Sequence, residues 1–207
     1  MKIYHQVNGY LAVNTYYLVN EDNNTAIVID GGVKAENIID FSTNKGFKVT
    51  HMLLTHGHFD HSACAKKMQS AGVLVGINEV EKDGLSNPKL TLSGLFNIPY
   101  QQTSPDFTFK NGEELTINGI KIKVILTAGH SIGSTCFLVD NYLFSGDTLM
   151  NETVGRCDFD GGSFSELNES LKKLLLLPDE TVVYPGHGEQ TTIMHEKLYN
   201  PYMPIKN

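Results

Sequence analysis

Three histidines and an aspartate occupy the six positions 56–61, within the segment THGHFDH at residues 55–61. Imidazole and carboxylate groups together suit divalent ions such as Zn²⁺, Mn²⁺ and Fe²⁺. In an extended loop, His56 and His58 point to the same side and can bind one ion. Asp60 and His61 follow where the chain enters a helix, so they would face a neighbouring position. The spacing therefore predicts a metal site rather than a group of packed histidines.

Three further candidate ligands each follow a predicted strand and stand beside glycine: His130 in LTAGHS, Asp147 in FSGDTL and His187 in YPGHG. Glycine lets the backbone turn sharply at these points, and strand ends that meet at one sheet edge are where α/β folds build their sites. Together with the cluster, these residues offer six to seven nitrogen and oxygen ligands. That number is too large for one tetrahedral ion but suits two ions that share a bridge, for which Asp147 has two oxygens.

Other polar residues have two possible roles each. Asp30 in VIDGG either forms a turn or orients a metal ligand through a hydrogen bond. Arg156 is the only arginine, and its planar fork could bind a substrate carboxylate or form a salt bridge that fixes its own loop. We expect the Cys157 thiol to pack against its surroundings rather than act as a nucleophile. The remaining histidines outside these motifs are expected to be structural: His5, His51 and His195.

Strand-like and helix-like segments alternate along the chain without a linker or repeat. Strands are predicted at residues 16–20, 25–30, 48–55, 73–77, 107–109, 113–117, 120–128, 134–140, 142–147 and 180–188. Helices are predicted at residues 33–46, 62–72 and 163–178, with a short one near the C-terminus. Residues 87–106 contain three of the seven prolines and are predicted to form a loop. This order favours one α/β domain over residues 1–207, with two mixed sheets packed face to face and helices outside.

The composition narrows the functional class. The chain of 207 residues is 41% hydrophobic and 19% charged, as is typical of a globular domain, and its net charge of −7 disfavours nucleic acid as a partner. Three distant cysteines suit a reducing compartment. No signal peptide is recognisable, and the longest apolar run, LLLL, is too short to span a membrane. We expect a cytoplasmic protein that binds a small molecule and has no membrane partner. The sequence does not determine its oligomeric state.

The motifs THGHFDH, AGHS, SGDTL and PGHG, in this order, resemble those of the metallo-β-lactamase superfamily over essentially the whole chain. This resemblance implies an αβ/βα four-layer sandwich of two mixed sheets flanked by helices. The segments VGRCDFDGGSFSELNESL and YPGHGEQTTIMHEKLYNP are similar to the short glyoxalase II-like hydrolases. By this resemblance, the first metal would be held by His56, His58, His130 and Asp147. The second would be held by Asp60, His61, Asp147 and His187.

The resemblance implies a hydrolase with two divalent metal ions, zinc being expected and iron or manganese being alternatives. The substrate would be a thioester such as S-lactoylglutathione, or an analogous thiol adduct, attacked by a metal-bridging hydroxide. Asp60 would orient this hydroxide and could accept its proton. Glyoxalase II enzymes carry a C-terminal helical domain that helps to bind glutathione. This chain stops about where that domain would begin, so we expect it to lack the domain.

Two alternatives remain open at this point. Persulfide dioxygenases resemble the chain too, and use one iron held by the equivalents of His56, His130 and Asp147. Lactonases share the two-metal chemistry and differ in the substrate pocket. A thiolate leaves without a strong general acid, whereas an amide needs a protonated amine, which favours thioesters or esters over β-lactams.

Overall fold

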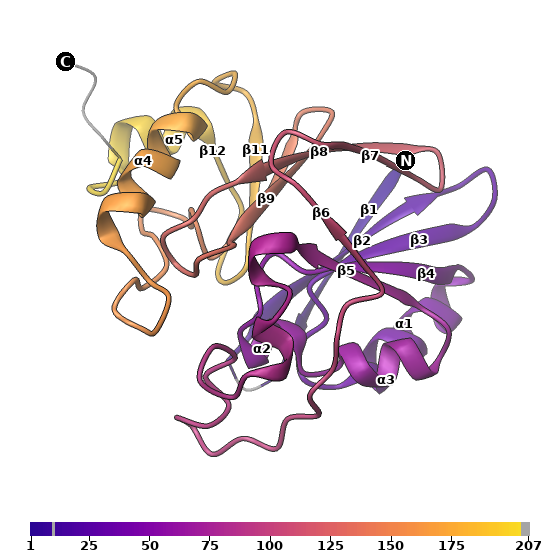
Figure 1. Ribbon diagram of the computed structural model, residues 1–207. Helices are drawn as coiled ribbons and strands as arrows, with labels where there is room; N and C mark the ends of the chain where they lie inside the picture. The colour runs from indigo at the N-terminus through magenta and orange to yellow at the C-terminus, as the bar shows by residue number, and fades with distance from the viewer. Residues whose placement is uncertain (10, 204–207) are drawn as a thin grey trace.

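The computed structural model describes residues 1–9 and 11–203, in which two mixed six-stranded sheets pack against each other (Figure 1). The first sheet contains β1 (Lys2–Asn8), β2 (Val13–Asn20), β3 (Thr25–Ile29), β4 (Lys48–Leu53), β5 (Leu74–Asn78) and β6 (Phe107–Phe109), in that order. The second contains β12 (Thr191–Thr192), β11 (Val182–Pro185), β10 (Tyr142–Gly146), β9 (Thr135–Val139), β8 (Ile120–Leu126) and β7 (Glu114–Ile117). Strands β3 to β6 run parallel to one another, as do β10 and β11, and the other neighbours are antiparallel.

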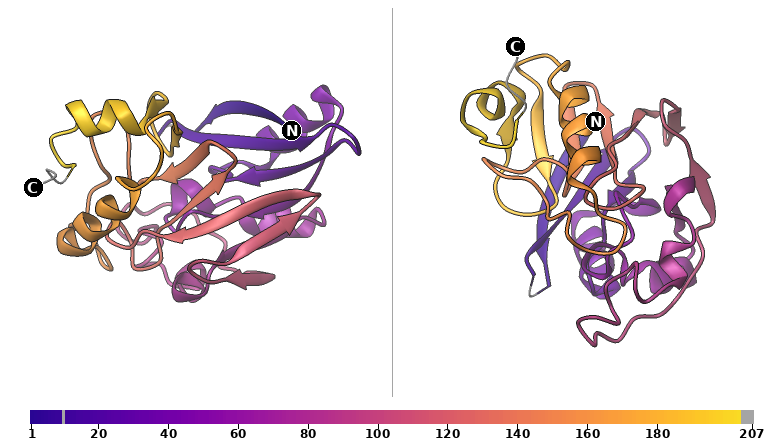
Figure 2. Two further views of the ribbon diagram at one scale, coloured as in Figure 1. Left: turned by 90° about the horizontal axis from the view of Figure 1, so that it is seen from above. Right: turned by 60° about the vertical axis from the view of Figure 1, so that its left-hand side comes forward.

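Three separate apolar layers hold the fold together. The middle layer lies between the sheets and joins Ile27 and Leu53 of the first to Phe137 and Phe144 of the second. One outer layer packs the first sheet against the helices α1 (Ala35–Lys45) and α3 (Ala65–Ser70). The other packs the second sheet against α4 (Phe164–Leu174) and α5 (Ile193–Tyr199). Three layers of core between four layers of structure confirm the αβ/βα sandwich (Figure 2).

Helix ends follow the local sequence. Helix α1 stops at Gly46, whose left-handed backbone (φ 79°) no other residue type adopts as readily. Helix α4 starts at Ser163, whose hydroxyl accepts a hydrogen bond from the Glu166 amide. Its buried Leu167 and Leu171 are four residues apart and face the second sheet. The helices predicted at residues 33–46 and 163–178 are therefore present, with shorter ends.

The helix predicted at residues 62–72 was wrong in its extent. The chain forms a short helix α2 (Phe59–Ser62) and then α3, because the Cys64 amide donates to the Gly32 carbonyl instead of continuing the helical ladder. Helix α2 starts three residues earlier than expected and carries Asp60 and His61 on its single turn. Strands β1 and β12 were also missed. Strand β1 is a half-buried edge strand, and β12 is only two residues long, so neither has a strong sequence pattern.

Five chain segments leave their strands at the same edge of the sandwich. They follow β3, β4, β8, β10 and β11, and they contain every candidate ligand found in the sequence. Between β5 and β6 lie two short 3₁₀ helices, η1 (Glu79–Glu81) and η2 (Gly84–Ser86), and then the irregular residues 87–106, as expected. That segment lies below the first sheet in the view of Figure 1. None of the helices in the described ranges is long and apolar enough to cross a membrane.

Candidate metal centre

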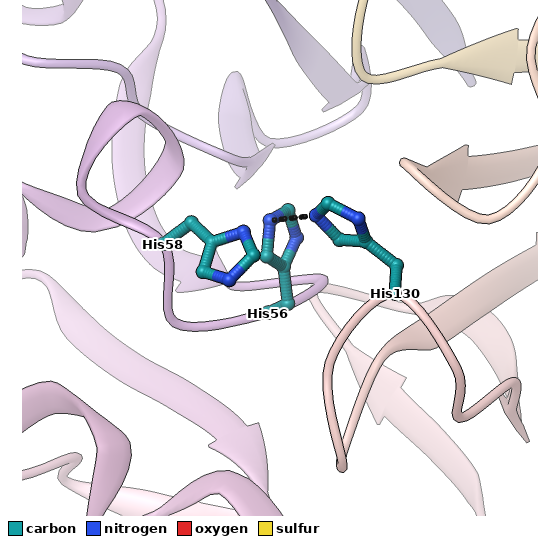
Figure 3. A group of neighbouring side chains, drawn as sticks. All are labelled: His56, His58 and His130. Carbon is teal, nitrogen blue, oxygen red and sulfur yellow. Dashed lines mark hydrogen bonds between the residues drawn. The ribbon is translucent and has the colours of Figure 1, made fainter. Parts of the chain in front are cut away.

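The structure brings the seven predicted ligands together in three overlapping groups. In each group, one potential ligand atom from every residue lies within 4.8 Å of the others. The groups are His56, His58 and His130; Asp60, His61 and His187; and His56, His61 and Asp147. The first group is shown in Figure 3, where the imidazoles of the His56 loop meet His130 from the opposite sheet. Because the third group shares members with both assigned metal positions, the arrangement has the composition of a two-ion site with Asp147 in the middle.

The hydrogen bonds around His56 and His130 leave two nitrogen lone pairs facing each other. His130 Nδ1 donates to the Arg156 carbonyl at 2.6 Å, so Nε2 of the neutral ring carries no proton. The Thr55 hydroxyl gives its proton to Asp30 (2.8 Å) and therefore accepts from His56 Nδ1 (3.0 Å). The two Nε2 atoms nevertheless lie 3.2 Å apart (Figure 3). A cation between them removes this repulsion.

Hydrogen bonds to the far ring nitrogen also hold His61 and His187. His61 Nδ1 donates to the Asp30 carboxylate at 2.8 Å, and His187 Nδ1 donates to the Leu11 carbonyl at 3.0 Å. Their Nε2 atoms lie 3.3 Å apart, near Asp60 Oδ2. Such hydrogen bonds to the far nitrogen are the usual way in which proteins orient metal-binding histidines.

Two buried polar atoms in the site have no hydrogen-bond partner among the described residues. They are His58 Nε2 and Asp147 Oδ1. Asp147 lies between the groups, with Oδ1 at 3.5 Å from His61 Nε2 and Oδ2 at 3.6 Å from both His130 and His187 Nε2. Leaving such groups unsatisfied is costly, and bound divalent ions would compensate for it. The residues therefore fit a pair of divalent ions.

The electrostatics differ across the centre. Burial lowers the pKa of His56 and His58 far below the ordinary value, and neighbouring imidazoles lower it further. Burial also lowers the pKa of His61, but Asp60, Asp30 and Asp147 outweigh this and raise it to about 10. The carboxylates that favour a proton on His61 also favour a dication in its place.

Asp60 is ionised at neutral pH. Burial opposes ionisation, yet the charge of His61 and the hydrogen bond and charge of His187 outweigh it and lower the Asp60 pKa. Its side chain is 13% exposed, as against 0% for His61, so it lies at the accessible side of the centre. The structure thus places an accessible carboxylate next to the second ligand group.

Asp30 orients ligands and does not form a simple turn. It is buried, and its two oxygens accept from the Thr55 amide (2.9 Å), the Thr55 hydroxyl and His61 Nδ1. Its φ of 52° is strained for a non-glycine residue. Through Thr55 it also reaches His56, so one carboxylate orients members of both ligand groups. Thr55 was missed because a threonine in a loop carries no distinctive pattern.

The sequence also gave no indication of Glu81. This residue follows β5 and is buried, with 3% exposure. Its carboxylate accepts from the Gly57 amide (2.9 Å), the Ser131 hydroxyl (2.8 Å) and the Gly133 amide (2.6 Å). Glu81 therefore ties the loop that carries His56 and His58 to the loop that carries His130.

The N-terminal hairpin positions the last ligand. The side chain of Asn14 donates to the carbonyls of Pro185 and Gly188, at 2.9 Å each, on both sides of His187. The Leu11 carbonyl holds the His187 ring itself. These contacts cross more than 170 residues of sequence, so local patterns could not reveal them.

Glycine at position 186 is required by close approach. A Cβ there would overlap Asp147 Oδ1 and lie 2.8 Å from His61 Cε1. Position 155 is similar, since a Cβ would lie 2.8 Å from His130 Nδ1. The glycines beside the ligands therefore make room for them.

Arg156 uses its side chain within its own loop. Its Nε and Nη2 donate to the two oxygens of Asp158 at 2.9 and 2.8 Å, and the guanidinium stacks on Phe159 at 4.3 Å. The sequence allowed either a salt bridge within the loop or a substrate contact for Arg156, and the structure contains the salt bridge. The guanidinium face that could bind a substrate carboxylate is paired with Asp158. Cys157 is half-buried and packs against the core beneath the second sheet, as expected. The three histidines expected to be structural belong to none of the ligand groups: His5, His51 and His195.

Comparison with known proteins gives the family. Residues 8–187 match the metallo-beta-lactamase superfamily. The chain belongs to this superfamily. It is 37% identical to a probable metallo-hydrolase of Streptococcus pyogenes serotype M6, over 98% of this chain and 90% of the relative. It is 34% identical to the hydroxyacylglutathione hydrolase GloC of Haemophilus influenzae, over 92% of each. It is a metallo-hydrolase with a histidine and aspartate cluster suited to divalent ions.

Solved structures agree with this assignment. The BLEG-1 B3 metallo-beta-lactamase superposes with a TM-score of 0.93 and 33% identity, over 98% of this chain and 99% of that one. The di-iron-bound form of TTHA1623 superposes with a TM-score of 0.86 and 29% identity, over 96% and 99%. These neighbours share the fold of this chain; one is described as a metallo-beta-lactamase and the other as a di-iron-bound form.

Proposed function

We propose that this metallo-hydrolase cleaves thioesters, with S-lactoylglutathione or an analogous thiol adduct as substrate. The observation that carries the proposal is the pair of ligand groups joined by Asp147, with the Nε2 atoms of His56 and His130 3.2 Å apart in one group and those of His61 and His187 3.3 Å apart in the other. The likeness to a hydroxyacylglutathione hydrolase over 92% of both chains supports the substrate class.

Two divalent ions, when bound, supply a hydroxide nucleophile at neutral pH and polarise a carbonyl group. The first ion would be held by His56, His58, His130 and Asp147. The second would be held by Asp60, His61, Asp147 and His187. Zinc suits this set of nitrogen and oxygen ligands, as do iron and manganese. The di-iron form of a structural neighbour supports two ions without selecting the metal.

The chain's own carboxylates would orient the nucleophile. Asp60 is ionised, partly accessible and 3.3 Å from His187 Nε2, so it can accept a hydrogen bond from an attacking water and orient it. A thiolate has a pKa of about 8.5 and leaves without a proton donor. A thioester therefore makes the smallest demand on acid catalysis at this site.

The decisive test is an assay of S-lactoylglutathione hydrolysis in which the released free thiol is measured. The protein is purified without added metal, and its metal content is determined. We expect about two metal ions per chain and a rate that falls after chelation and returns when metal is restored. A His58→Ala variant should bind the first ion more weakly and lose activity, and unchanged metal content with unchanged activity would refute the ligand assignment. One iron per chain with oxygen uptake on a persulfide would instead support the dioxygenase alternative.

β-Lactam hydrolysis is a second candidate, because the BLEG-1 B3 metallo-beta-lactamase superposes over nearly the whole of both chains. A penicillin and a lactone, assayed on the same preparation, test this candidate and the lactonase alternative. We expect the thioester to have the highest kcat/KM of the three.

A further inference from the structure

A groove beside the metal centre has no role in the chemistry described so far. It lies between residues 88–95 of the irregular segment and residues 158–160, and it encloses about 440 Å³. Its apolar lining comes from Pro88, Leu92, Leu95 and Phe159. We call it the 88–160 groove. Its volume is that of a site for a small organic group.

The 88–160 groove adjoins the first ligand group. The Phe159 ring, which lines it, lies 6.2 Å from the His58 ring between centroids. The wall on the other side is anchored to the ligand helix, because the Phe59 amide donates to the Thr91 carbonyl at 2.8 Å. A ligand group that contacts Phe159 in the groove therefore lies close to His58 of the first ligand group.

The wall formed by residues 88–95 is held in place by backbone hydrogen bonds. Its amides bond internally, from Gly94 to the Pro88 carbonyl (3.0 Å) and from Phe96 to the Leu92 carbonyl (3.1 Å). Leu92 holds a left-handed backbone, with φ at 61°, which is costly for leucine. Strain of this kind persists when the surrounding structure fixes it, and here it accompanies a leucine that lines the groove.

Three charged residues also line the groove, Lys89, Asp158 and Asp160, and one of them is paired within the opposite wall. Asp158 is neutralised by the two hydrogen bonds from Arg156, and the Arg156 guanidinium covers one part of the Phe159 ring. At the rim, Leu95 is 66% exposed and Phe96 is 49% exposed. Exposed apolar side chains clustered at the mouth of a site indicate contact with an apolar ligand.

We propose that the 88–160 groove binds the acyl group of the substrate and favours apolar acyl chains over small polar ones. This inference rests on the proposed thioester hydrolysis and specifies its substrate class. The carbonyl would lie at the metal centre, and the alkyl chain would extend past His58 and Phe159 toward Leu92 and Leu95. Each methylene buried there adds to transition-state binding.

The test compares S-acetyl-, S-butanoyl- and S-hexanoylglutathione with S-lactoylglutathione on the metal-loaded enzyme. We expect kcat/KM for the hexanoyl thioester to exceed that for the acetyl thioester by about tenfold or more. Leu95→Ser should reduce this ratio at least about threefold, because it replaces apolar lining of the groove with a hydroxyl group. Leu176→Ser is the matched control, because Leu176 is 85% exposed and lies beyond the end of α4, and it should leave the ratio unchanged.

Binding separates this inference from the proposed function. S-Hexylglutathione, a thioether that cannot be hydrolysed, should bind more tightly than S-methylglutathione in calorimetric titrations, and Leu95→Ser should remove the difference. If no thioester is cleaved, the proposed function fails, while these titrations still test the groove. Equal kcat/KM across the acyl series with equal thioether affinities would overturn the acyl groove and leave the hydrolase intact. A rate set by the thiol carrier alone would also overturn it.

Discussion

The two ligand groups of the metal centre differ in exposure and in charge. The histidine half, made of His56, His58 and His130, is sealed, with all three residues at 4% exposure or less. The carboxylate half, made of Asp60, His61 and His187, is open on one side, where the His187 side chain is 25% exposed and that of Asp60 is 13%. The first half offers only imidazoles, and the second has carboxylates on several sides of His61.

This difference assigns separate tasks to the halves. Burial lowers the pKa of His56 and His58, which therefore stay neutral. The histidine half thus depends on the orientation of its rings, which the surrounding hydrogen bonds fix. The carboxylate half attracts cations through its charge and is accessible to water. We therefore expect the histidine half to hold its ion more rigidly and the carboxylate half to exchange its ion with solvent more readily.

Removing the residue between the halves should have the largest effect. Asp147→Asn replaces the carboxylate that faces His61, His130 and His187, so it should weaken both ions and lower kcat/KM by about 1000-fold or more. Metal analysis and thioester hydrolysis measure the effect, and thermal unfolding checks that the variant folds. Normal metal content with full activity would show that Asp147 bridges nothing.

Single-ligand variants should separate the halves. His187→Ala should lower the metal content from about two ions to about one, with the remaining ion in the histidine half, and reduce kcat/KM about 100-fold. His58→Ala should weaken the other half. Equilibrium dialysis with increasing chelator should remove one ion from the native protein before the other. Identical metal affinities in the two variants would contradict the comparison.

Changing the carboxylate that orients ligands should have a smaller effect. Asp30→Asn keeps the shape but weakens acceptance from His61 and Thr55, so metal affinity should fall by about 10- to 100-fold. The loss should be greater in the carboxylate half, which Asp30 contacts directly. Competition with a metal indicator measures it. Unchanged affinity would reduce Asp30 to a turn residue.

Glu81→Gln tests what holds the histidine half together. The glutamine amide would place N–H groups against donors that now point at a carboxylate, so the free energy of unfolding should fall by about 2 kcal/mol. Metal affinity should fall in the histidine half alone. Denaturant unfolding of the metal-free protein gives the first quantity. Glu79→Gln, two positions earlier and exposed, is the control that should change neither quantity.

The smallest effect is expected at the cysteines. Burial raises the pKa of Cys64 to about 12 and that of Cys136 to about 11, so both stay protonated and inert at neutral pH. Mass spectrometry after alkylation of the native protein should find modification at Cys157 only. Cys157→Ser should retain kcat/KM within about twofold, because the thiol packs and does not attack. A large loss would make it a nucleophile.

The sequence was sufficient for the parts of the site in which chemistry and glycine lie next to each other. His130, Asp147 and His187 each follow a strand and carry a glycine neighbour, and the structure brings them to the THGHFDH cluster. The sheets were predicted from alternation and turn residues, except for the edge strand β1 and the two-residue β12.

Apart from Asp30, the residues that orient the ligands could not be found in this way. Glu81, Thr55 and Asn14 act through hydrogen bonds to backbone or side-chain atoms in other segments, and each is an ordinary polar residue in its own neighbourhood. Their partners are defined only when the two sheets pack. The break between α2 and α3 has the same origin, since a distant carbonyl at Gly32 competes for the Cys64 amide.

The hydrogen bond from His187 to the Leu11 carbonyl has a consequence for folding. It closes a loop of 176 residues, so the last ligand reaches its position only after the two ends of the domain have come together. Contacts of such long sequence separation form slowly and late. During synthesis, nearly the whole chain must therefore be made before the N-terminal segment can contact His187 and complete the centre. Full metal occupancy then reports that the polypeptide has reached its native topology.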